Sequence, residues 1–284
     1  MRFALALLAA LVPSAAVASM WTDPDWGTMI AKSDLIVRAE VTEGGTFEAT
    51  VKIVATFRGA APAESIVVGG FNNGNWPADA VQKESFVAGE AYFLFLRAVS
   101  LKEVELLAVR DPKRKPLVEK AKAGLVYAVW TPTAGDVPIG TEGVRYRLGG
   151  TGYSQHQGAR SVEELERFLK AAVAAADGKP DAAYLKELKA GLASAKAVDP
   201  DYPHRLLAYE YAGGSELLPS FDAVTRGGDE DAMRSVARIA GRAGGNEARG
   251  LLVAHLDQSD GVVQGEAVRQ LGAGAFPAGE VAPL

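Results

Sequence analysis

Three histidines are the first candidates for chemistry in this chain of 284 residues. His156 lies in a polar stretch, His204 follows a proline at an expected helix start, and His255 lies inside another expected helix. No two of them share a helix face as metal ligands do, and no H-E-x-x-H motif is present. Nucleophile-elbow and P-loop motifs are also missing from the sequence. The residues therefore favour a protein with no metal, no cofactor and no catalytic activity.

The segment Gly69–Asp79, GGFNNGNWPAD, is the first candidate binding feature. Trp76 offers an aromatic surface, and Asn72, Asn73 and Asn75 offer amide donors and acceptors, which suits a loop that binds a sugar, a peptide or a partner's edge. A second interpretation is structural. Trp76 then covers the end of a barrel, and the asparagines and glycines supply turn geometry.

Residues 1–18 have the pattern of a secretory signal peptide. Arg2 precedes an apolar run, and the run ends in Ala16-Val17-Ala18, an A-x-A cleavage site. We expect cleavage after Ala18 and a mature protein in the periplasm or outside the cell. Trp21 and Trp26 follow the cleavage site, and we expect them to pack against the barrel or to bind a partner.

Composition excludes several classes of function. The chain has no cysteine, so disulfides and thiolate chemistry are impossible. Its net charge is −5, and neither half is basic, so the electrostatic signature of a nucleic-acid binder is missing. After residue 18 no apolar run is long enough to span a membrane.

Residues 34–150 have the pattern of a strand-rich domain. Thr46–Phe57 alternates, with Phe47, Val51 and Phe57 among the residues on one side and polar residues on the other, as in a half-buried strand. Further short runs predict strands at Leu35–Val41, Ser65–Gly70, Ala91–Val99, Val104–Val109, Leu125–Thr131 and Val144–Leu148.

This half resembles a bacterial exported β-barrel module of the OB-like netrin/TIMP type. The resemblance rests on Ser33-Asp34-Leu35-Ile36-Val37, on Phe57-Arg58-Gly59, and on the Gly89-Glu90-x-Tyr92-x-x-Phe95-Leu96 run. It implies an antiparallel OB-like barrel. Metalloprotease inhibition by TIMPs needs a disulfide-anchored N-terminal cysteine, so that activity is not implied here.

After residue 160 the hydrophobic period becomes helical. Ser161-x-x-Glu164 is a capping box, and Asp181 can cap the next helix. Asp231–Leu256 resembles the short HEAT-like repeat of the PBS-lyase type, in which two helices flank a Gly turn. Gly213, Gly241 and Gly272 mark possible copies at steps of 28 and 31 residues.

Arginines of these repeats are the second candidate binding feature. HEAT-like stacks bind partners along a ridge of helices, and an arginine-lined ridge suits acidic peptides. Solubility is the alternative role for these side chains, and Arg242 is expected to face solvent. The candidates are Arg234, Arg238, Arg242, Arg249 and Arg269.

Together these patterns predict an α+β protein of two domains. A signal peptide (1–18) precedes an OB-like barrel (19–150), a linker (151–160) and a HEAT-like helical domain (161–284). The expected function is non-catalytic binding of a protein or peptide partner. A hydrolase with its site between the domains and a carbohydrate or envelope-polymer binder using Trp76 are the alternatives.

Overall fold

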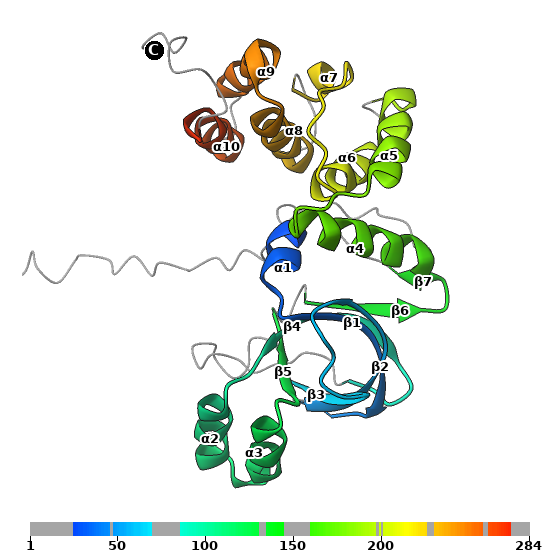
Figure 1. Ribbon diagram of the computed structural model, residues 1–284, viewed down its shortest axis with the longest axis vertical. Coiled ribbons are helices and arrows are strands. Elements are labelled where there is room, and N and C mark those ends of the chain that lie inside the picture. The colour runs from blue at the N-terminus through cyan, green and yellow to red at the C-terminus, as the bar shows by residue number, and fades with distance from the viewer. Residues whose placement is uncertain are drawn as a thin grey trace, which may run out of the picture.

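The computed structural model describes residues 25–45, 48–69, 86–130, 135–144, 160–196, 199, 201–225, 230–257 and 261–273. A strand barrel forms the N-terminal part and helices form the C-terminal part, so the chain is α+β as expected (Figure 1).

Five strands close the barrel. They are β1 (Leu35–Glu43), β2 (Glu48–Arg58), β3 (Ser65–Gly69), β4 (Ala91–Ala98) and β5 (Val126–Val129). They pair in the order β1-β2-β3-β5-β4, and β4 pairs again with β1. The short strands β6 (Asp136–Gly140) and β7 (Gly143–Val144) extend the sheet from β4. The strands expected at 35–41, 46–57, 65–70, 91–99 and 125–131 are thus confirmed wherever the structure describes those residues.

The barrel is not wholly antiparallel, which corrects one part of the expected fold. β3 and β5 run parallel, with Val67 opposite Val126. A parallel pair needs a long crossover connection. Here the described part of that connection contains β4 and three helices within residues 101–122. Short-range alternation in the sequence carries no information about such a parallel pairing.

Burial on one face or on two explains the strand patterns. In β4, Phe93 and Phe95 pack against helices, whereas Leu94 and Leu96 fill the barrel. A strand buried on both faces has a continuous apolar run. β2 alternates because its outward residues are exposed or only partly buried. Phe57 departs from this alternation and packs against Phe93, because register shifts in the β1–β2 ladder turn the end of β2 toward the helices.

The strand expected at Val104–Val109 is wrong. These residues lie in α2 (Leu101–Arg110), which begins with a complete capping box between Ser100 and Glu103. Only Val104 and Ala108 are buried on this helix, a spacing of one helical turn. The short helix η1 (Pro112–Arg114) links α2 to α3 (Lys115–Lys122), and this helical pair covers the outer faces of β3 and β5.

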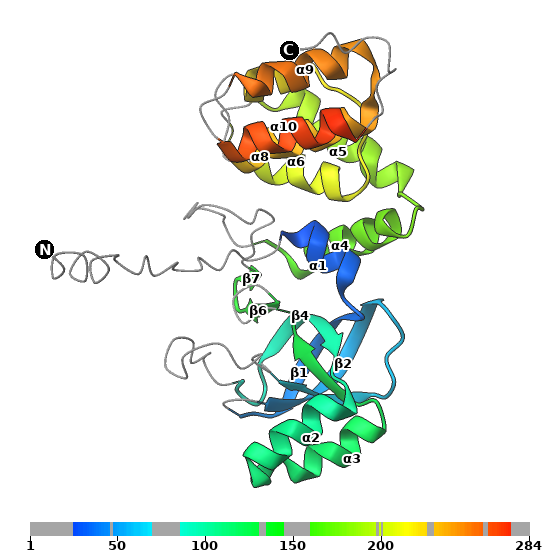
Figure 2. The same cartoon turned by 90° about the vertical axis from the view of Figure 1, so that its left-hand side faces the viewer.

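Two helices lie between the barrel and the rest of the helical region (Figure 2). They are α1 (Trp26–Lys32) and α4 (Val162–Ala176), and one apolar core joins them to β1, β4 and α6 (Tyr202–Tyr211). Trp26 is 3% exposed and packs edge-on against Phe95, with ring centroids 4.9 Å apart. The expected burial of Trp26 is confirmed, and Trp21 lies outside the described residues. Ser161 caps α4 by accepting from the backbone N–H of Glu164, but the Glu164 side chain bonds to Arg160, so the predicted capping box is only half formed. Asp181 caps α5 (Ala182–Ser194) as the sequence predicts.

The remaining helices form successive antiparallel pairs. They are α5 (Ala182–Ser194), α6 (Tyr202–Tyr211), α7 (Phe221–Thr225), α8 (Glu230–Ala243), α9 (Gly245–Leu256) and α10 (Gly261–Gly272). Figure 1 shows α6, α8 and α10 in one row with α5, α7 and α9 beside it. α8 and α10 approach closely at Gly241, where an added Cβ would lie 2.1 Å from the Gln270 side chain. The proposed boundary between domains, within 148–161, stays a prediction, because most of that segment lies outside the described residues.

Substitutions at the neighbouring residues Leu252 and Val253 test which face of α9 is buried. Leu252 is 0% exposed and Val253 is 42% exposed. We expect Leu252→Asp to lower the free energy of unfolding by at least about 3 kcal/mol, because it buries an unpaired carboxylate. Val253→Asp should cost less than about 1 kcal/mol. Urea unfolding of both variants measures the difference, and similar costs would contradict the register.

Candidate functional site

One of the two candidate binding features lies outside the described part of the chain. Trp76, Asn72, Asn73 and Asn75 all fall within residues 70–85, so their binding role stays a prediction.

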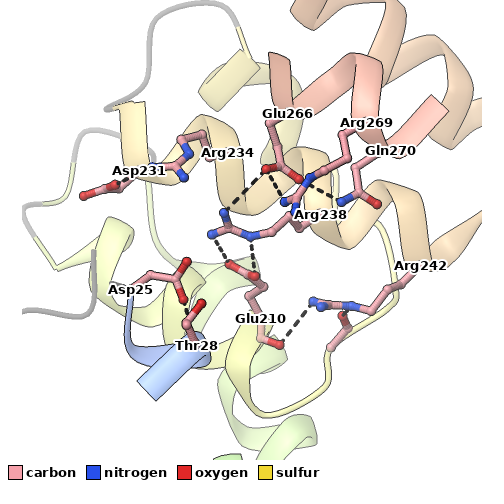
Figure 3. Close-up of polar contacts among 11 residues, drawn as sticks. Asp25, Thr28, Glu210, Asp231, Arg234, Arg238, Arg242, Glu266, Arg269 and Gln270 are labelled. Atoms are coloured by element: carbon pink, nitrogen blue, oxygen red, sulfur yellow. Dashed lines mark hydrogen bonds and ion pairs between the residues drawn. The ribbon is translucent and has the colours of Figure 1, made fainter. Parts of the chain in front are cut away.

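Arg238 is held in an ion pair between two helices. Its Nε and Nη2 atoms donate to the two carboxylate oxygens of Glu210 on α6, at 2.5 and 2.8 Å (Figure 3). The Glu210 side chain is only 4% exposed. Burial by itself would lower the pKa of Arg238, but the Glu210 carboxylate outweighs it and raises that pKa above its ordinary value. Arg238 therefore stays charged, and both of its bonds join α8 to α6.

The pair continues into a ladder across three helices. Glu266 on α10 lies 4.0 Å from Arg238, and it accepts hydrogen bonds from Arg269 and Gln270 (Figure 3). Glu210, Arg238 and Glu266 are spaced at steps of 28 residues, so acid, base and acid follow one another along the stack. Neither glutamate was predicted from the sequence. The 28-residue step between Gly213 and Gly241 was the signal that could have found them.

The sequence predicted that Arg242 faces solvent, and the structure shows that this side chain also makes contacts within the protein. Its side chain has exposed surface, but its guanidinium donates to the backbone oxygens of Gly214 and Glu210, both at 3.1 Å. It thus ties α8 to the end of α6. The structure brings Arg238, Arg242 and Arg269 together on one side of the stack.

The other two candidate arginines stand apart from this ladder. Arg234 forms an ion pair with Asp231 on the same helix at 3.7 Å, as Figure 3 shows. Arg249 lies on α9, in the other row of helices.

Two histidines are built into the helical core. The ring nitrogens of His255 lie 2.7 Å from the oxygen of Leu251 and 3.0 Å from that of Met233, which joins α9 to α8. His204 is 5% exposed, and burial, helped by nearby arginines, lowers its pKa to about 3. Both rings are therefore part of the packing between helices, while His156 lies outside the described residues.

Within the part of the chain that the structure describes, no cluster of three or more His, Cys, Asp or Glu side chains has the arrangement of a metal site. None of the helices found there is both long and apolar enough to cross a membrane.

Comparisons with known proteins give no match. No protein-family model fits the chain, and no curated protein or solved structure is significantly similar to it.

Arg238 and Glu210 can be tested with a double-mutant cycle. Arg238→Met leaves the buried Glu210 carboxylate without its main partner and should cost about 3–5 kcal/mol of unfolding free energy. Glu210→Met should cost less, because Glu266 remains near Arg238. Combining both changes should recover much of the loss, since neither charge is then left unpaired.

Arg167 provides the control for this cycle. It forms a comparable ion pair with Glu187, but both side chains are more than half exposed. Arg167→Met should therefore cost less than about 1 kcal/mol. Equal costs for the two arginine variants in urea unfolding would show that the Glu210–Arg238 pair does not hold the stack.

His204 predicts a specific dependence of stability on pH. The unfolded chain binds a proton at this residue near pH 6.5, whereas the folded chain does not bind it until about pH 3. Its contribution to stability is therefore complete above pH 6.5 and is lost progressively as the pH falls toward 3. The slope is about 1.4 kcal/mol per pH unit. Urea unfolding at pH 7 and pH 5 should show a smaller loss in His204→Gln than in wild type. Parallel losses would exclude His204 as the cause.

Proposed function

We propose that this chain is an exported, non-catalytic binding protein whose helical stack holds a protein or peptide partner. The observation that carries the proposal is the Glu210–Arg238–Glu266 ladder. It fixes α6, α8 and α10 in one row at a constant step, which is how repeat stacks build an extended surface. The signal-peptide pattern of residues 1–18 supports the proposal that the protein is exported to the periplasm or out of the cell.

Two features of the fold support the proposal that the strand barrel is OB-like and that the helical part is HEAT-like. A closed barrel of five strands, in which β1 pairs with both β2 and β4, fits an OB-like domain. The helical pair α8–α9, with a glycine turn at Gly244 and buried Ala240 and Leu252, fits a HEAT-like repeat. Both fold types are used widely for binding.

The last two helices are the best candidate for the partner surface. Val253 on α9 and Val262 and Val268 on α10 are among the large apolar side chains that stay exposed, at 42%, 49% and 59%. Arg269, which is 65% exposed, lies beside Val268. Large apolar side chains that stay exposed on neighbouring helices favour a contact surface. The partner that fits it has apolar side chains and an acidic group.

Val268 and Val54 give a matched test of this surface. Val54 lies on β2 and is 51% exposed, close to the 59% of Val268. Each variant serves as bait in a periplasmic extract. The Val54→Glu variant should still capture the partner that wild type captures. The Val268→Glu variant should lose this partner while its melting temperature stays unchanged. A charge at the centre of an apolar contact should weaken binding at least about tenfold. Equal capture by both variants would place the partner elsewhere, and no capture by wild type would contradict the proposal.

A further inference from the structure

A groove of about 240 Å³ lies between α5 and the turn that follows α6. Leu185 and Lys186 contribute to its wall from α5, and Tyr209 contributes from α6. Ser215 and Glu216 close it from the turn. The groove is on the helical region but lies away from α9 and α10, so it is independent of the partner surface proposed above.

The turn that shapes the groove is fixed by close packing. At Gly214 an added Cβ would lie 2.4 Å from the Tyr209 ring, so only glycine fits against that ring. The backbone N–H of Glu216 donates to the Tyr209 hydroxyl at 3.2 Å. These contacts hold the turn in place before any ligand arrives, which lowers the entropy cost of binding.

The charged side chains of the groove differ in whether they have an ion-pair partner. The Lys189 ammonium pairs with the Glu216 carboxylate across the groove. In the described part of the chain, Lys186 and Ser215 have neither a hydrogen-bond partner nor an ion-pair partner. The groove thus contains one neutralised pair, one uncommitted positive charge and one uncommitted hydroxyl.

We propose that this groove binds a carboxylate attached to a small apolar group, as at the C-terminus of a peptide. The carboxylate accepts hydrogen bonds from Lys186 and Ser215, and the apolar group packs on Leu185 and the Tyr209 ring. A single uncommitted charge complements a monoanion better than a phosphate dianion, which would also approach the Glu216 carboxylate. The volume is below the roughly 300 Å³ of drug-sized pockets, so one terminal residue is the part that fits.

Titration of the full chain with N-acetylalanine and with N-acetylalaninamide tests the proposal. The two probes differ only in whether the terminal group is a carboxylate. Amide shifts in a two-dimensional NMR spectrum should move at Lys186, Ser215 and Glu216 with the acid, with a dissociation constant of about 1 mM or weaker. The amide probe should bind about tenfold more weakly, because it lacks the charge-assisted bond.

Lys186→Met should reduce the affinity for the acid to that for the amide. The control is Lys170→Met on α4, where the lysine side chain is 67% exposed and lies outside the groove; this variant should bind as wild type does. Equal binding of acid and amide, an unchanged Lys186→Met, or tighter binding of inorganic phosphate at the same amides would each overturn the proposal. Val268→Glu should leave this titration unchanged, so failure at one surface is distinguishable from failure at the other.

Discussion

The apolar core between the barrel and the helices is the constraint on which the rest of the structure depends. Trp26 contacts Phe95 of β4 and Phe168 of α4, so side chains from three distant parts of the sequence meet there. β4 must therefore be apolar on both faces, because its other face fills the barrel. Moving the barrel away from α4 would expose this whole core to water. The barrel wall therefore fixes the position of α4, and through it that of α6.

Buried charges add to the apolar contacts where the stack continues from α6 to α10. Glu210 and Glu266 are 4% and 5% exposed, so each needs a cation held in place. Arg238 meets this need for Glu210 and lies close to Glu266, and it therefore has little capacity left for an outside ligand. A buried pair of this kind adds little net stability but penalises any shift of one helix along the next. It therefore sets the register of α6, α8 and α10.

Local patterns in the sequence predicted the elements whose own periodicity is visible, and they gave no information on contacts between distant residues. β2 could be found because one face is exposed and the alternation is visible. α2 was mistaken for a strand because a short apolar run does not distinguish the two periods, although Ser100 and Glu103 formed a capping signal. The role of Arg238 could not be found from its own helix, since Glu210 lies 28 residues away. The sequence shows that residue 238 is a cation, but only the fold shows that Glu210 neutralises it.

Arg242 links the stack to the groove. Its bonds to the oxygens of Gly214 and Glu210 satisfy carbonyls at the C-terminal end of α6, where a cation is also favoured by the helix dipole. The same turn presents Ser215 and Glu216 to the groove on its other side. The shape of the groove therefore depends on the position of α8, which the Glu210–Arg238 pair fixes. The same turn is held from the α6 side by the Tyr209 ring, which leaves no space for a Cβ at Gly214. The register of the stack and the shape of the groove are thus set by one group of contacts around the end of α6.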